Sequence, residues 1–200
     1  MLDRLGHEMY LDRAAQFRFR LGWNVQLDEN GYEKDEYDER NPIYIILSDS
    51  AGTHRASMRF LPTTEKVMVN EAFADKTGVE IRSPLIWECT RFCLSPTATR
   101  EDSTRLLLGT LELGLIFGLS YFVGVFENRM LRVYKNIGWS PEILGYDTLD
   151  RNGTSVGIWW VDASQKDCFS SRLDLSPNWE INRVGDVLSR PDRTENLLLN

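Results

Sequence analysis

Arginines, carboxylates and aromatic residues recur at defined spacings in the first half of this 200-residue chain. Arg13 precedes Phe17 by one helical turn, and Trp23 follows a Leu-Gly pair. Asp35 and Asp38 lie in an acid-rich segment. Carboxylates suit a cationic ligand, arginines suit a carboxylate, and aromatic faces suit a cation or a flat ring. Together these residues could bind a small ligand that carries charges of both signs.

Two apolar, strand-like segments also contain charged residues. Arg59 lies in Met-Arg-Phe-Leu-Pro-Thr, and Glu88 and Arg91 lie in Trp-Glu-Cys-Thr-Arg-Phe. Such side chains are costly to bury unless they are paired or face a pocket. A regular strand points Glu88 and Arg91 to opposite faces, so both could serve one pocket only across a bulge. Without a bulge, Arg91 would instead pair with the acidic segment, and we favour this structural role.

Other common catalytic and metal-binding sites are not indicated. The two histidines, His7 and His54, are too few for a histidine metal site, and their contexts do not suggest a serine triad. The sequence contains no Gly-rich phosphate-binding motif and no Cys-x-x-Cys pair. Cys89 and Cys93 read as small buried hydrophobic residues, and an odd number of cysteines suggests a reducing compartment. We therefore expect no metal site.

Composition limits the class of protein. A net charge of −7 argues against nucleic acid as the main partner. The apolar segment 106–126 contains Glu112, which would be costly to bury in lipid, so we expect a buried helix and strand rather than a membrane span. The N-terminus lacks the apolar core of a signal peptide, which favours a cytoplasmic protein. The length fits a single domain over residues 1–200.

The elements that must position the charged residues are predicted from periodicity and turn residues. A polar loop is expected at 24–42. Helices are expected at 3–20, at 104–119 with Asp102 or Ser103 as its cap, and at 128–137 with Gly138 as its stop. Strands are expected at 44–48, 56–61, 84–92, 121–126, 142–146 and 155–162. Strands that alternate with helices around a mixed sheet indicate an α/β sandwich.

The order of these motifs resembles that of the acyl-homoserine lactone synthases of bacterial quorum sensing. It runs Arg-x3-Phe, Leu-Gly-Trp, Asp-x-Tyr-Asp, Arg-Phe-Leu-Pro-Thr and Trp-Glu-x-Thr-Arg-Phe over residues 13–92, and Ile-Gly-Trp at 137–139 also fits. The resemblance implies a GNAT-like three-layer α/β/α sandwich with a mixed, mostly antiparallel central sheet. It also implies an acyltransferase that joins S-adenosylmethionine, a substrate rather than a cofactor, to an acyl group carried by acyl carrier protein.

The implied reaction forms an amide and then closes the lactone ring, which releases methylthioadenosine. A mobile N-terminal part, residues 1–42, is expected to help bind S-adenosylmethionine. Since an ammonium cannot attack a thioester, a base must take its proton, and Glu88 is the candidate. The resemblance assigns to the S-adenosylmethionine pocket and its charge network Arg13, Phe17, Trp23, Asp35, Asp38, Arg59 and Arg91.

The acyl donor needs its own contacts. The apolar segments 104–119 and 121–126 could wall a tunnel for the acyl chain, with Gly124, Val125 and Met130 in its lining. Many family members that prefer 3-oxo chains carry Thr or Ser in place of Gly124, so an unsubstituted chain is favoured. A basic stripe is expected to dock the acidic carrier protein, and it consists of Arg129, Arg132 and Lys135.

Each of these functional assignments also has a simpler structural interpretation. The acidic segment could be a solvated loop, Arg59 and Glu88 could pair within the sheet, and the basic stripe could be an ordinary exposed helix face. Gly124 could serve only tight packing. Two other functions stay open, an N-acyltransferase of the same fold that uses acyl-coenzyme A and an inactive acyl-binding homologue. The (Gln/Arg)-x-x-Gly-x-(Gly/Ala) loop that binds coenzyme A is not found.

Overall fold

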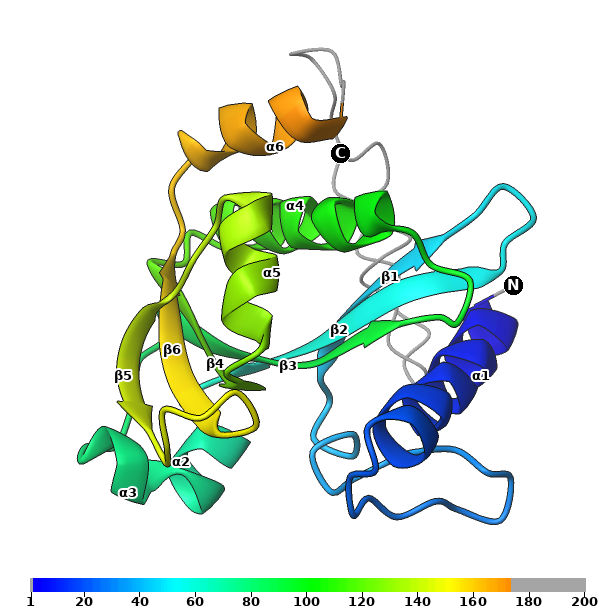
Figure 1. Ribbon diagram of the computed structural model, residues 1–200, viewed down its shortest axis with the longest axis horizontal. Coiled ribbons are helices and arrows are strands. Elements are labelled where there is room, and N and C mark those ends of the chain that lie inside the picture. Colours follow the sequence, from blue (N-terminus) through cyan, green and yellow to red (C-terminus); the bar gives the residue numbers. More distant parts are fainter. Residues whose placement is uncertain (1, 174–200) are drawn as a thin grey trace. The chain divides into compact units, whose positions relative to one another are not determined.

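The computed structural model describes residues 2–173. Its residues group into two compact units (Figure 1). The first comprises residues 2–59 and 91–106, and the second comprises 60–90 and 107–173. Each unit is built from both helices and strands.

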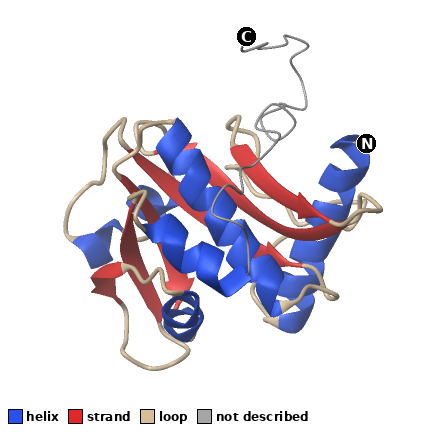
Figure 2. Cartoon of the chain, turned by 90° about the horizontal axis from the view of Figure 1, so that it is seen from above, coloured by secondary structure: helices blue, strands red, loops and turns tan. Residues whose placement is uncertain are grey.

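Six strands form one mixed sheet in the order β1-β2-β3-β4-β6-β5. The β3–β4 pair is parallel, whereas β6 pairs antiparallel with both β4 and β5. Helices are interspersed with these strands along the chain, and Figure 2 shows both kinds of element, which confirms the expected α/β class with a mixed sheet. Their bounds are β1 Ile43–Ser48, β2 His54–Pro62, β3 Ile86–Leu94, β4 Tyr121–Glu127, β5 Glu142–Tyr146 and β6 Thr154–Trp160.

In the first unit, helix α1 (Leu2–Arg13) packs against β1 and continues into the π-helix η1 (Ala14–Arg20). The sequence predicted a helix here but not its wider π geometry. Both Gln16 and Phe17 are buried in η1. The Gln16 carboxamide donates to the carbonyl of Phe92 (2.7 Å) and accepts the N–H of Leu94 (2.9 Å), so η1 is tied to the end of β3.

The second unit has an aromatic core. Phe126 of β4, Tyr134 of α5 and Trp159 of β6 contact one another with ring centroids 5.1 to 5.5 Å apart. Helix α5 ends at Gly138, whose φ of 92° confirms the predicted stop. The other helices that lie wholly in this unit are α2 (Met68–Ala72), α3 (Ala74–Thr77) and α6 (Gln165–Leu173), with α5 spanning Met130–Ile137.

Helix α4 (Arg100–Ile116) begins earlier than predicted. Asp102 is not its cap but lies within the first turn. Thr99 and Asp102 exchange hydrogen bonds, because the Asp102 carboxylate accepts the Thr99 N–H (2.7 Å) and the Thr99 hydroxyl accepts the Asp102 N–H (3.4 Å). This reciprocal arrangement is a capping box, which starts the helix one turn before the expected 104–119.

The apolar segment 106–126 folds as most of α4, a turn and most of β4. Glu112 within it is paired with Lys166 of α6 at 2.7 Å. Across residues 2–173, no helix combines the length and apolar character needed to cross a membrane.

Strand β4 does not bring the predicted acyl-pocket residues to one face. Its pairing with β6 is regular from Tyr121 to Glu127, so Gly124 and Val125 point to opposite faces. A Cβ at Gly124 would lie 2.7 Å from the carbonyl oxygen of Cys89. The glycine thus serves tight packing of β4 against β3, as the simpler interpretation held. Gly124 and Val125 therefore do not share one face of β4, and the acyl-pocket lining of Gly124, Val125 and Met130 stays a prediction.

Substitution of Gly124 tests this packing. Gly124→Ala should lower the free energy of unfolding by about 1–3 kcal/mol, because the added methyl group overlaps a backbone atom that is fixed in the sheet. Gly6→Ala is the matched control, since a Cβ there meets nothing within 4 Å. It should raise the free energy of unfolding by about 0.5–1 kcal/mol through helix propensity. Equal effects in denaturant unfolding would contradict the tight contact.

Candidate active site

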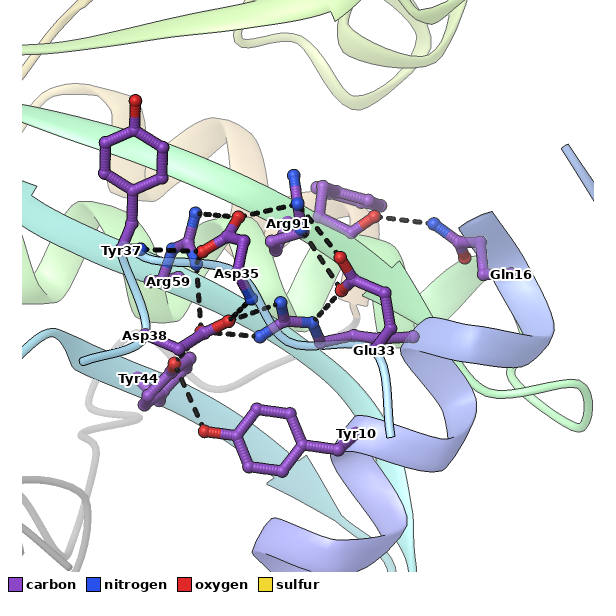
Figure 3. A network of polar contacts seen from close by, with 11 residues as sticks. Tyr10, Gln16, Glu33, Asp35, Tyr37, Asp38, Tyr44, Arg59 and Arg91 are labelled. Atoms are coloured by element: carbon purple, nitrogen blue, oxygen red, sulfur yellow. Dashed lines mark hydrogen bonds and ion pairs between the residues drawn. The ribbon is translucent and has the colours of Figure 1, made fainter. Parts of the chain in front are cut away.

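Six charged side chains of the first unit form a closed ion-pair ring (Figure 3). Each neighbouring pair has an N···O distance between 2.5 and 2.9 Å. Every cation lies between two anions and every anion between two cations, so the formal charges cancel. In order around the ring, its members are Arg13, Glu33, Arg91, Asp35, Arg59 and Asp38.

The ring brings together five of the predicted site residues and adds Glu33. The Glu33 carboxylate joins Arg13 (2.6 Å) to Arg91 (2.9 Å), and it is fully buried. Sequence analysis missed Glu33 because it lies in a run of charged residues. Neither its residue type nor its spacing distinguished it from Glu36 or Glu39. The sequence feature that could have identified Glu33 is its position two residues before Asp35. In an extended segment this spacing places both side chains on the same side.

Electrostatics keep the Asp38 carboxylate charged despite its burial. Burial opposes the charge of Asp38, but hydrogen bonds from Arg13 and the positive charges of Arg13 and Arg59 outweigh that effect and hold the pKa of Asp38 well below its usual range. The Tyr44 hydroxyl also donates to this carboxylate. Burial and the nearby Asp38 charge raise the pKa of Tyr44, so Tyr44 remains a neutral donor.

An aromatic pair lies beside the ring. Phe17 and Trp23 stack with ring centroids 4.9 Å apart and planes inclined by 14°. The Arg91 guanidinium lies 5.5 Å from the centroid of Phe17. The two predicted aromatic residues therefore meet each other and one corner of the ring.

That corner is the accessible part of the ring. Asp35 and Arg91 expose 21% and 11% of their side chains, whereas the other four members expose 4% or less. A ligand that reached the ring would first contact one carboxylate and one guanidinium beside a stacked aromatic pair. Such a corner can hold an amino-acid group, since it offers an anion to the ammonium and a cation to the carboxylate.

Arg91 has an unusual backbone conformation. Its φ is 56°, which a side-chain-bearing residue adopts rarely, although it lies within β3. This breaks the strand alternation that would have opposed Arg91 to Glu88. The guanidinium reaches Glu33 and Asp35, so the favoured pairing with the acidic segment is present in the structure. Strain of this kind is retained where surrounding contacts require it.

Glu88 belongs to the second unit and is only 1% exposed. Its carboxylate accepts main-chain N–H groups of Met68 (3.2 Å) and Val69 (2.6 Å) at the start of α2. These hydrogen bonds offset part of the cost of burying a charge. Glu88 is paired in register with Val123, so both side chains lie on the same face of the β3–β4 pair.

The basic stripe is divided by its contacts. Arg129 forms an ion pair with Glu127 and precedes the first residue of α5. Arg132 and Lys135 lie on α5 and are exposed. Within residues 2–173, no group of three or more His, Cys, Asp or Glu side chains is placed to hold a metal ion.

Removal of one ring carboxylate should destabilise the protein in a pH-dependent way. Asp38→Asn leaves Arg13 and Arg59 short of one negative charge and should cost about 3–5 kcal/mol of unfolding free energy at pH 7. Because the pKa of Asp38 is lower in the folded protein than its unfolded value of about 3.9, its contribution is complete above that pH and declines below it.

Urea unfolding of both proteins at a series of pH values measures this difference. The gap between parent and variant should stay constant down to about pH 5 and narrow below about pH 4. A gap that does not change down to about pH 3 would show that Asp38 is not held ionised by the ring.

Sequence comparison relates this chain to one family of proteins. A family model described as autoinducer synthase matches residues 3–169. An acyl-homoserine-lactone synthase of Rhizobium etli is 38% identical over 177 residues, which cover 84% of this chain and 82% of that protein. One of Pseudomonas fluorescens is 31% identical over 150 residues, covering 72% and 70% respectively.

Solved structures show the same fold. A coenzyme A-dependent acyl-homoserine lactone synthase, BjaI, with S-adenosylmethionine and isopentyl-coenzyme A, superposes with a TM-score of 0.77 at 21% identity, covering 86% of this chain and 83% of that one. TofI, in a ternary complex with an inhibitor and methylthioadenosine, superposes with a TM-score of 0.70 at 26% identity, covering 86% and 90%. The expected GNAT-like fold is thereby confirmed. The chain belongs to the autoinducer synthase family, the acyl-homoserine-lactone synthases, which are acyltransferases.

Proposed function

We propose that this chain makes N-acyl-L-homoserine lactone from S-adenosylmethionine and an acyl group carried by acyl carrier protein. The observation that carries the proposal is the accessible corner of the ion-pair ring beside the Phe17–Trp23 stack. The proposed site of action is the cytoplasm. The whole of 1–200 is proposed to act as one synthase domain.

S-adenosylmethionine matches this corner group by group. Its ammonium suits Asp35, its carboxylate suits Arg91, and its sulfonium or adenine suits the face of Trp23. The four buried ring members and Phe17 would then act by fixing Asp35, Arg91 and Trp23 in place. A fixed site costs less entropy on binding than one that must be ordered by its ligand.

Glu88 is the proposed base of the first step. It takes a proton from the α-ammonium, directly or through one water, and the free amine attacks the thioester carbonyl. The tetrahedral intermediate collapses to the amide and expels the thiolate, which takes up a proton. In the second step, the carboxylate oxygen attacks the carbon next to the sulfonium, and methylthioadenosine leaves with the bonding electron pair. Since that leaving group is already activated, positioning dominates this step.

The acyl chain is proposed to be unsubstituted. Gly124 offers no hydroxyl group to a 3-oxo function, and its contact with Cys89 leaves no room for a serine or threonine there without movement of β3. Met130, which is half-buried at the start of α5, remains a proposed wall of the acyl pocket.

Carrier-protein docking is proposed for the exposed part of the basic stripe. Arg132 and Lys135 lie one turn apart on α5 and face solvent. A chain with net charge −7 needs a local basic surface to approach an acidic partner, because the overall charges repel each other. Arg129 contributes less, since Glu127 neutralises it.

Methylthioadenosine release tests the chemistry. Purified protein is supplied with S-adenosylmethionine and with acyl carrier protein bearing short, medium or long chains, with matching acyl-coenzyme A in parallel. Release should depend on the acyl donor, and Glu88→Gln should slow it by about 10²–10⁴-fold because the amine stays protonated. Glu80→Gln, an exposed glutamate of the same unit, is the control and should be as fast as the parent.

The outcomes separate the alternatives. Equal rates for the two glutamine variants would remove Glu88 as the base. Release with acyl-coenzyme A alone would replace the proposed donor. No release from folded parent with any donor would leave the inactive acyl-binding homologue, and acyl transfer without methylthioadenosine would point to another N-acyltransferase.

Charge reversal tests the docking surface. The double variant Arg132→Glu/Lys135→Glu should raise the KM for the acyl carrier protein by about tenfold, and the parent's rate should fall steeply with salt. The KM for S-adenosylmethionine should not change. Arg82→Glu, an exposed arginine of the same unit, is the control. An unchanged KM for the carrier protein in the double variant would place the docking surface elsewhere.

A further inference from the structure

The carboxylate of Glu88 is oriented by helix α2, which precedes it by some distance in the chain. Its Oε1 accepts the Val69 N–H (2.6 Å) and its Oε2 accepts the Met68 N–H (3.2 Å), so main-chain groups direct both oxygens. Hydrogen bonds weaken steeply when they bend, so this pair favours one rotation of the carboxylate. The direction in which Glu88 can accept a proton therefore depends on where the start of α2 lies.

Burial keeps the start of α2 in the core but does not by itself fix its angle. Val67 and Val69 are fully buried. Apolar contacts have no preferred direction, so they allow small rotations of a helix of five residues. A directional contact is needed to hold two amides on one carboxylate.

Asn70 supplies a contact of this kind. Its carboxamide donates to the carbonyl of Ile81 (2.9 Å) and accepts the Ile81 N–H (2.9 Å). A neighbouring strand would make the same two hydrogen bonds with a single residue. The contact joins α2 to the segment 81–86, which leads directly into β3 and so to Glu88.

The segment 81–86 is itself fixed to the end of β2. Thr63, which follows that strand, is fully buried. Its hydroxyl donates to the Ile86 carbonyl (2.9 Å) and accepts the Ser83 N–H (3.0 Å). Asn70 thus ties α2 to a fixed part of the second unit, and the helix keeps one position relative to the start of β3.

We infer that Asn70 is a positioning residue for Glu88, because its carboxamide locks α2 to the segment before β3 and keeps the first two amides of α2 on the Glu88 carboxylate. The inference rests on the proposed role of Glu88 as the base. Asn70 acts through the main chain of α2 and takes no part in the proton transfer itself. Without it, the amides shift and the carboxylate loses its aim at the ammonium, which costs rate rather than substrate binding.

A double-mutant cycle on the full chain tests this inference. Asn70→Ala should lower kcat by about tenfold, which is part of the 10²–10⁴-fold that a base typically contributes, and should change the KM for S-adenosylmethionine by less than about twofold. In the Glu88→Gln background there is no base to position, so the same substitution should change kcat by less than about twofold. A purely structural role would lower kcat by the same factor in both backgrounds.

Thr77→Ala is the matched control. The Thr77 hydroxyl donates to the Val79 carbonyl (2.7 Å) in the same connection between α2 and β3, but this hydrogen bond stays within one turn. Its kcat should equal that of the parent. The inference is overturned if Asn70→Ala leaves kcat unchanged, if its loss is repeated in full in the Glu88→Gln background, or if Thr77→Ala loses as much.

Amide hydrogen exchange gives a readout that needs no turnover. The Val69 amide should exchange about tenfold faster in Asn70→Ala than in the parent, while the amides of the β4–β6 pairing keep their rates and show that the variant is folded. An unchanged Val69 rate, or an equal acceleration of all amides, would overturn the inference. Absence of lactone with every donor would refute the proposed function, whereas Val69 exchange would still decide whether Asn70 holds α2 against Glu88.

Discussion

The alternation of charge around the ion-pair ring is the constraint on which the rest of the first unit depends. Its members come from α1, from the irregular loop 24–42 and from strands β2 and β3. The loop has no helix or strand of its own to hold it in place. Pairing of Glu33, Asp35 and Asp38 with three arginines fixes the loop to these elements. Burial of so many charges adds little net stability, so its value lies in specifying one arrangement.

The same constraint explains the conformation of β3. Arg91 must turn its guanidinium toward Glu33 and Asp35, and the strand accepts a left-handed residue to allow this. Before that point, Glu88 follows regular strand geometry and is held by the amides of α2. Strand β3 thus supplies Arg91, which pairs with loop 24–42, and Glu88, which binds the start of α2. The left-handed conformation of Arg91 makes this possible.

Much of the fold was predictable because it depends on local patterns. The hairpin of β1 and β2, strand β4 and helix α5 with its Gly138 stop all follow from periodicity and turn residues. The ring arginines and aspartates were found because their order matches a known family. Glu33 and the start of α4 were not found, since the first depends on a partner 58 residues away and the second on a threonine that also fits a loop. The acyl-pocket lining stays a prediction, and its two strand residues, Gly124 and Val125, lie on opposite faces because adjacent residues of a regular strand alternate.

The Gln16 side chain covers part of a strand edge in β3 that has no neighbouring strand. Regular pairing of β3 with β4 ends at Glu88 and Val123, so the later part of β3 loses its neighbour on that side. Ser95 directs its N–H toward β2, and by alternation Phe92 and Leu94 direct theirs away from it. Unpaired strand edges recruit strands from other chains. The Gln16 carboxamide, with one donor and one acceptor, takes the place of a neighbouring peptide group and makes this edge unavailable for intermolecular β-pairing.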